Sequence, residues 1–320
     1  MKKFLFYFAL SLFLAGCDNS FPLDDILLEN DRIERDTIDS DGDPVIVNPI
    51  DDGTREFGLD NSYCYGLTPL PDEEVAKVDI EIRFPQSHDI SQFLPPVDTQ
   101  GNQGSCVAWA TGYYLKSFQE NYENFVNGMP DDEVILSPSF VFNQIKIQPC
   151  DGSQIADALE LLKNLGTPEL SAMPYNENDC IVQPSEVQLA LAEENRIGSY
   201  YYLDPEILFE QTKAFLLQSQ PVVIAISIDR NYFGAKEDGI AVYRKFSKVD
   251  GAHAMLVVGY DDSMNAFKVV NSWGRSWGNE GFVWIDYKAF KEANLPESDF
   301  KILCEAWVSY DLTQQEEASS

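Results

Sequence analysis

The stretch QGNQGSCVAWA, residues 100–110, places Cys106 at the end of a glycine-rich approach and at the start of an apolar segment. From Cys106 to about Gln119 apolar side chains recur at spacings of three and four, which predicts a helix with Cys106 at its N-terminus. A cysteine in this position is a packed core thiol, half of a disulfide or an activated nucleophile. The rest of the sequence has to decide among these three.

The elements around this stretch predict an α+β fold with two lobes. Before Pro221 the pattern favours helices, the first two beginning at the serine caps Ser153 and Ser185, with one strand ahead of them. After Pro221 short β-branched and aromatic runs are separated by turn residues, which is typical of a sheet or barrel. The predicted helices are 153–166, 185–195 and 205–220, and the predicted strands are 78–84, 221–228, 253–260, 266–273, 282–287 and 301–310.

The charge of the chain is strongly acidic, with a formal net charge of −31 over 320 residues. Such a surface repels phosphate backbones, so we expect no nucleic acid partner. Much of the charge is local, because residues 18–76 carry 17 acidic side chains against three arginines. We interpret residues 18–75, which are also rich in Gly and Pro, as an extended acidic linker.

The first 17 residues have a basic start, an apolar run too short to span a bilayer, and small residues before Cys17. Leu14-Ala15-Gly16-Cys17 resembles the lipobox of bacterial lipoproteins, which implies cleavage before Cys17 and lipidation of its thiol. An ordinary signal peptide followed by a chance cysteine is the alternative. We therefore expect an extracytoplasmic protein, anchored to the bacterial cell envelope by lipid, in a compartment that permits disulfides.

Five cysteines remain after Cys17, an odd number that predicts one free thiol. The chain has only two histidines. His88 lies among polar residues and is expected to be a solvated surface side chain, whereas His253 opens an apolar strand and is followed 18 residues later by Asn271. A thiol, an imidazole and an amide that orients the imidazole are the components of an acyl-transfer triad.

Three stretches resemble the papain (C1) family of cysteine peptidases: QGNQGSCVAWA at 100–110, AHAMLVVGY at 252–260 and NSWGRSWGNEGF at 271–282. Weaker similarities to the same family occur at SAMPY, 171–175, and QPVVIAI, 220–226. The resemblance implies a papain-like peptidase domain over 76–312, followed by a disordered tail at 313–320. It also implies a helical N-terminal lobe and an antiparallel, β-barrel-like C-terminal lobe, with the active site in the cleft between them.

The resemblance assigns roles to individual residues. Cys106 is the expected nucleophile, His253 the acid and base, and Asn271 the residue that orients the ring. Gln100 is expected to supply an amide N–H to the oxyanion hole beside the Cys106 N–H. The residues expected to bind substrate are Gly152, Ser153, Ala252 and Trp273, the last also shielding the Asn–His contact from water.

Departures from the family pattern affect the cysteines. Gln103 stands where most family members have a cysteine, so Cys150 has to pair elsewhere or stay free. Cys180 is its nearest candidate partner, and Cys64 and Cys304 are the candidates for a second bridge. Disulfide connectivity does not follow from sequence alone. No metal is expected, since histidines and cysteines show no ligand spacing, and no cofactor is expected either.

The sequence therefore predicts a cysteine endopeptidase that cleaves protein or peptide substrates through a thioester acyl-enzyme. With two histidines in all, it lacks the histidine-pair occluding loop of dipeptidase-like relatives. Two alternatives stay open: a transpeptidase that uses the same triad, and an envelope protein that uses a peptidase fold to bind peptides. The altered residues Gln103 and Ser153 favour the second alternative. It is disfavoured by the intact Cys106, Gln100, His253 and Asn271.

Overall fold

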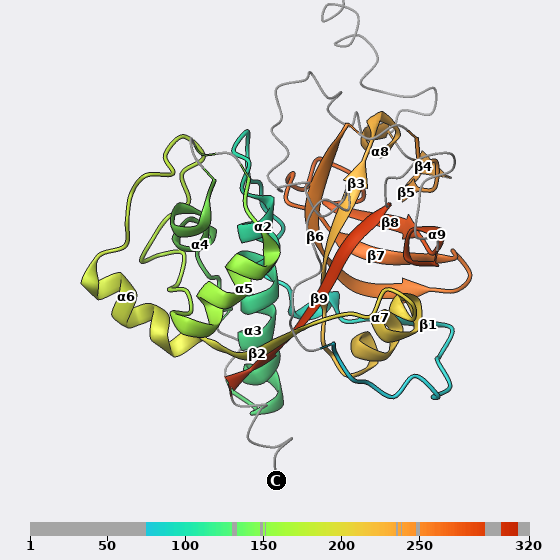
Figure 1. Ribbon diagram of the computed structural model, residues 1–320, viewed down its shortest axis with the longest axis horizontal. Helices are drawn as coiled ribbons and strands as arrows, with labels where there is room; N and C mark the ends of the chain where they lie inside the picture. Colours follow the sequence, from blue (N-terminus) through green and yellow to red (C-terminus); the bar gives the residue numbers. More distant parts are fainter. Residues whose placement is uncertain are drawn as a thin grey trace, which may run out of the picture. The chain divides into compact units, whose positions relative to one another are not determined.

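The computed structural model of the protein describes residues 75–129, 133–147, 150, 152–234, 236–237, 239–247, 250–291 and 302–312. All of them belong to one compact unit, Asn48–Ser320. The predicted signal peptide, the acidic linker up to residue 74 and the predicted tail lie outside the described residues, so these boundaries stay predictions. Within the described part, helices α2 to α6 gather on one side and strands β3 to β8 on the other (Figure 1).

A continuous helical run begins at Cys106, as predicted, but it is longer and wider than an ordinary helix. It consists of α2 (Cys106–Ala108), the π-helical η3 (Trp109–Lys116) and α3 (Ser117–Val126). Gly112 allows close packing in the π-helical part, because a Cβ there would lie 2.9 Å from a methyl group of Val141. π-helical turns are rare in proteins overall, and those that do occur are often found at functional sites.

The other predicted helices are observed near their predicted positions, with one correction, and four further helices were not predicted: Ser91–Phe93, Pro138–Ile145, Arg230–Gly234 and Lys288–Lys291. Of the two predicted serine caps, Ser185 is confirmed by a capping box with Gln188. Ser153 is not a cap: the N-cap of its helix is Gln154, and the Ser153 hydroxyl is buried without a hydrogen bond to the described residues. The remaining helices are η2 (Ser91–Phe93), α4 (Pro138–Ile145), α5 (Ile155–Asn164), α6 (Glu186–Ala192), η4 (Glu193–Asn195), α7 (Leu208–Leu217), α8 (Arg230–Gly234) and α9 (Lys288–Lys291).

The strands of the described residues form one sheet in the order β2-β9-β3-β6-β7-β8-β5-β4, with β1 paired to β6. Because the strand order begins at β2 and ends at β4 without closing, the predicted barrel-like lobe is an open sheet. Its neighbours are antiparallel apart from β5 and β8, which are parallel. The strands are β1 (Ser87–Asp89), β2 (Ile197–Tyr202), β3 (Val222–Ile228), β4 (Lys236–Glu237), β5 (Ile240–Tyr243), β6 (Gly251–Asp261), β7 (Ala266–Val270), β8 (Phe282–Asp286) and β9 (Leu303–Asp311).

The predicted strand at 78–84 is wrong. Its apolar and polar residues alternate in the sequence, but the backbone is irregular and Ile82 is exposed like its two neighbours. The segment has no ladder partner among the described residues: an isolated bridge joins Val75 to Tyr202 before it, and the first strand begins at Ser87 after it. Alternation in the sequence is therefore not enough for a strand, which also needs a neighbour to pair with.

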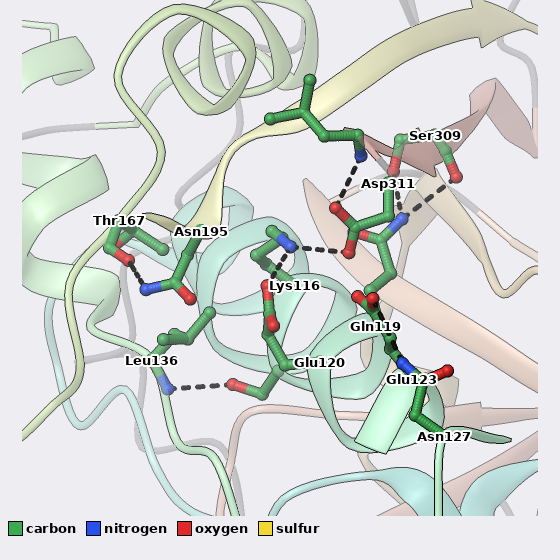
Figure 2. Close-up of polar contacts among 12 residues, drawn as sticks. Lys116, Gln119, Glu120, Glu123, Asn127, Leu136, Thr167, Asn195, Ser309 and Asp311 are labelled. Atoms are coloured by element: carbon green, nitrogen blue, oxygen red, sulfur yellow. Dashed lines mark hydrogen bonds and ion pairs between the residues drawn. The ribbon is translucent and has the colours of Figure 1, made fainter. Parts of the chain in front are cut away.

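A buried lysine joins the central helical run to the last described strand. Lys116, with no exposed side-chain surface, forms ion pairs with Glu120 and, at 2.8 Å, with Asp311 of β9 (Figure 2). One turn on, the Gln119 amide donates to the carbonyl and hydroxyl of Ser309, each at 3.1 Å. Burial raises the pKa of the Glu120 carboxyl, and the Lys116 charge opposes that rise.

Candidate active site

Cys106 lies at the first position of the helical run, on the side of the helical lobe that faces the sheet. It is fully buried and is not part of a disulfide. Its sulfur accepts a hydrogen bond from the backbone N–H of Ala254 in β6, at 3.4 Å. Because Ala254 is the neighbour of His253, this contact brings the thiol to the strand that carries the imidazole.

His253 and Asn271 are hydrogen-bonded across two neighbouring strands. The distance from His253 Nε2 to Asn271 Oδ1 is 2.7 Å, and both side chains are fully buried. The Asn271 oxygen also accepts the backbone N–H of Ser272 at 2.7 Å, which fixes the amide orientation. The predicted thiol, imidazole and amide are therefore brought together from three segments of the chain.

An aromatic cluster covers the imidazole. The Trp273 ring lies 4.7 Å from the His253 ring, centroid to centroid, and Phe233 stacks on Trp273 at 5.2 Å. Tyr232 contacts Trp273 edge-on at 5.5 Å. Trp273 thus lies against the imidazole, and its shielding of the Asn–His contact stays a prediction. Tyr232 and Phe233 of α8 were missed, since no pattern in their short segment points to a contact across 20 to 40 residues.

Gln100 is buried and joins the loop before Cys106 to the segment after Asn271. Its backbone N–H donates to the Ser272 carbonyl at 2.8 Å, and its side-chain oxygen accepts the Ser272 hydroxyl at 2.5 Å. One N–H of its side-chain amide goes to the Gln103 carbonyl at 2.9 Å. Sequence reasoning placed Gln100 near Cys106, but it missed Ser272, which holds the amide.

The predicted substrate-binding residues fall in two places. Ala252 precedes His253 in β6 and pairs with Ser227 of β3. Gly152 and Ser153 lie just before α5, which packs against α2. Their binding of substrate stays a prediction.

The cysteines agree with the predicted pairing where the structure describes them. Cys150 and Cys180 form a disulfide with a Cα–Cα distance of 6.1 Å. Cys304 is disulfide-bonded, but its predicted partner Cys64 lies outside the described residues, as does Cys17. Both of those predictions stay open.

His88 is not the solvated side chain that was expected. It is half-buried in β1, paired with Tyr260 at the far end of β6, with the two rings 6.3 Å apart. Seven residues of strand separate Tyr260 from His253, about 23 Å at the usual rise. His253 is therefore the imidazole at the thiol.

The described residues offer neither a cluster of metal ligands nor a membrane-spanning helix. No group of three or more His, Cys, Asp or Glu side chains there could hold a metal ion. Across the same ranges, no helix has both the length and the apolar character needed to cross a bilayer.

A thiol at a helix start beside an imidazole that an amide orients is the arrangement on which cysteine-type acyl transfer relies. The family model for "Papain family cysteine protease" matches residues 84–300, so the chain belongs to the papain family of cysteine proteases. This confirms the resemblance carried by the three sequence stretches.

Individual relatives agree with this assignment. The gamete and mating-type specific protein A of Dictyostelium discoideum is 28% identical over 204 residues, which cover 62% of this chain and only 41% of that protein. Cathepsin B-like CP2 of Giardia intestinalis is 25% identical, over 64% of this chain and 69% of the relative. The crystal structure of xylellain, a cysteine protease from Xylella fastidiosa, superposes with a TM-score of 0.66 at 22% identity, covering 81% of this chain and 97% of that one.

Proposed function

We propose that the protein is an endopeptidase in which Cys106 is the nucleophile, His253 the acid and base, and Asn271 the residue that orients the ring. The observation that carries this proposal is the 2.7 Å bond between His253 Nε2 and Asn271 Oδ1 beside the buried thiol. With Nε2 bonded to the amide, Nδ1 is the ring nitrogen that exchanges a proton with sulfur. The helix N-terminus and the imidazolium both favour the thiolate.

The reaction proceeds in two acyl transfers. The Cys106 thiolate adds to the substrate carbonyl carbon, and the negative charge that develops on oxygen is stabilised by N–H donors. The imidazolium of His253 donates its proton to the amine as the C–N bond breaks, which leaves a thioester. Water then adds to the thioester and gives a proton to His253, and the carboxylic acid leaves as the thiol returns.

Two N–H groups are suited to the oxyanion. The backbone N–H of Cys106 stands at the first position of the helical run, where N–H groups point out of the helix start. The side-chain amide of Gln100 uses one of its two N–H groups for the Gln103 carbonyl, and the second is suited to the substrate oxygen.

The test is the intact mass of the full chain, extracted in detergent and reduced, after brief treatment with an epoxysuccinyl thiol reagent. We expect a single adduct that depends on Cys106 and is lost in His253→Ala, together with hydrolysis of a peptide amide. A Cys106 that reacts no faster than an ordinary thiol would overturn the peptidase and favour peptide binding. Transfer of the acyl group to an added amine in preference to water would favour the transpeptidase.

We further propose that the chain is lipid-anchored at the bacterial cell envelope. The support is the lipobox-like Leu14-Ala15-Gly16-Cys17 after a short apolar run. Growth with an alkyne fatty acid should label the protein, and Cys17→Ser should abolish the label. Labelling that survives this substitution would contradict the anchor.

A further inference from the structure

The loop Gln100–Ser105 has to be held in place if Gln100 is to meet an oxyanion. Position 103 is a glutamine and no cysteine lies between Gln100 and Ser105, so no disulfide ties the loop at this point. The structure nevertheless gives the loop a dense set of hydrogen bonds. Besides the two bonds that join Gln100 to Ser272, most of them come from one distant segment, Tyr175–Glu177.

Within the loop, one carbonyl organises the amide of Gln100. The Gln103 carbonyl accepts both the Gln100 side-chain N–H, at 2.9 Å, and the Ser105 backbone N–H, at 2.8 Å. A displacement of Gln103 therefore rotates the amide that is suited to the oxyanion.

The Tyr175 hydroxyl bridges three points of this loop. It lies 2.8 Å from the Gln100 carbonyl, 3.0 Å from Gln103 Oε1 and 2.7 Å from the Ser105 hydroxyl. A phenol has one proton, which the two amide oxygens share, so the Ser105 hydroxyl is the donor to the tyrosine oxygen. Burial raises the pKa of Tyr175 to about 12, so the donor keeps its proton at neutral pH.

The next residues close over the outside of the loop. Gln103 Nε2 donates to the Glu177 carbonyl at 3.2 Å, and the Glu177 carboxylate accepts the Asn102 backbone N–H at 2.7 Å. Gly101 makes room for that carboxylate, because a Cβ there would lie 1.5 Å from its oxygen. The edge of the Trp109 ring fixes the Tyr175 ring from the helix side, at 4.9 Å.

We propose that Tyr175 is a positioning residue for catalysis. Through its bonds to the loop it keeps the side-chain amide of Gln100 directed at the position of the oxyanion, without a disulfide at position 103. This inference rests on the proposed function, because it concerns the oxyanion of the same reaction. Tyr175 acts through Gln100, Gln103 and Ser105 and does not touch the reacting atoms itself.

The test separates oxyanion chemistry from thiol chemistry in Tyr175→Phe. Hydrolysis of a peptide amide forms an oxyanion, whereas alkylation of Cys106 by iodoacetamide displaces iodide and forms none. We expect kcat to fall about 10-fold, a fraction of the effect of losing an oxyanion donor outright, with KM and the alkylation rate within twofold of the parent. The matched control is Tyr200→Phe, which removes a hydroxyl bonded to Glu160 on an exposed surface and should change none of the three.

A second variant keeps the test sharp should Tyr175→Phe fold poorly. Gln103→Ala removes the side-chain amide that bonds Tyr175 and Glu177 from the loop itself. It should give the same result, a lower kcat with KM and the alkylation rate nearly unchanged. Where both variants fold, the double variant should lose much less than the product of the single losses, since both act through one loop.

An unchanged kcat in Tyr175→Phe, a parallel fall in alkylation rate, or fully multiplicative losses would overturn the positioning role. Failure of the parent protein itself to hydrolyse peptides would instead overturn the proposed function, so the two failures are distinguishable.

Discussion

The two sides of the site are held by different kinds of bonds. On the sheet side, His253 and Asn271 are carried by β6 and by the end of β7, whose backbone ladder pairs Leu256 with Val270. On the loop side, the loop from Gln100 to Ser105 precedes a helix start and is held by Ser272 and by the side chains of Tyr175 and Glu177, which lie 70 to 75 residues away in sequence. The backbone thus determines the first geometry and a few individual side chains the second. Substitutions on the loop side should therefore lower kcat and leave the rate of Cys106 alkylation nearly unchanged.

The largest expected effect tests whether stability and site geometry are separable. Lys116→Met leaves the buried Asp311 and the partly buried Glu120 without their cation, so we expect a loss of about 3–5 kcal/mol in the free energy of unfolding at neutral pH. Lys116 lies ten residues from Cys106, more than two helical turns along the run, so kcat of the folded protein should stay unchanged. Urea unfolding and peptide hydrolysis measure the two quantities.

The pH dependence of this variant has a definite sign. Burial already raises the pKa of Glu120 in the parent, and loss of Lys116 removes a charge that opposes the rise. A carboxyl whose pKa is raised by folding binds protons more tightly in the folded state, so the stability of the variant should recover as pH falls from 7 to 5. Lys163→Met, at an exposed lysine, is the control and should cost less than about 0.5 kcal/mol. A deficit that grows on acidification would contradict this account.

The next effect concerns the sheet side. Asn271→Ala removes the acceptor that orients His253, and we expect kcat/KM to fall about 100-fold, or roughly 3 kcal/mol. Because the imidazole also supports the thiolate, the iodoacetamide rate should fall with it, unlike in Tyr175→Phe. Asn164→Ala, which removes an exposed amide bonded to Glu160, serves as control. Alkylation at the parent rate would show that the two sides do not differ in this way.

The smallest effect lies where the two sides meet. Ser272 belongs to the sheet side, yet its hydroxyl donates to Gln100 on the loop side. Ser272→Ala should lower kcat about 10-fold, near 1.4 kcal/mol, with little change in alkylation, because it releases only the amide. Exposed Ser171→Ala is the control. A fall in alkylation as large as that of Asn271→Ala would instead assign Ser272 to the positioning of His253.

Sequence patterns predict those parts of the fold in which a single segment carries its own signal. The β-branched runs at Val222–Ile228 and Gly251–Asp261 are strands, and Ser185 begins a helix as its capping pattern predicts. Strand β2, with three consecutive tyrosines, was missed because it lacks an apolar alternation, and its pairing comes from β9. The false strand at 78–84 has the alternation but no neighbour.

The same distinction applies to the site. Cys106, His253 and Asn271 are recognisable because each lies in a distinctive local stretch. The bonds from Tyr175 and Glu177 to the loop have no such signal, although SAMPY, 171–175, resembles a family segment. A tyrosine hydroxyl that serves three acceptors and donors depends on the relative placement of two loops, which only the folded chain determines.

The position of β9 has a consequence for biosynthesis. In the sheet this strand lies between β2 and β3, although it follows every other described strand in the chain. A ribosome therefore releases both neighbours long before the segment that joins them, and both edges stay unpaired until Leu303–Asp311 has been synthesised. A nascent chain that stalls before residue 303 exposes two unpaired strand edges. Chaperones can bind such edges, and other chains can pair with them and aggregate.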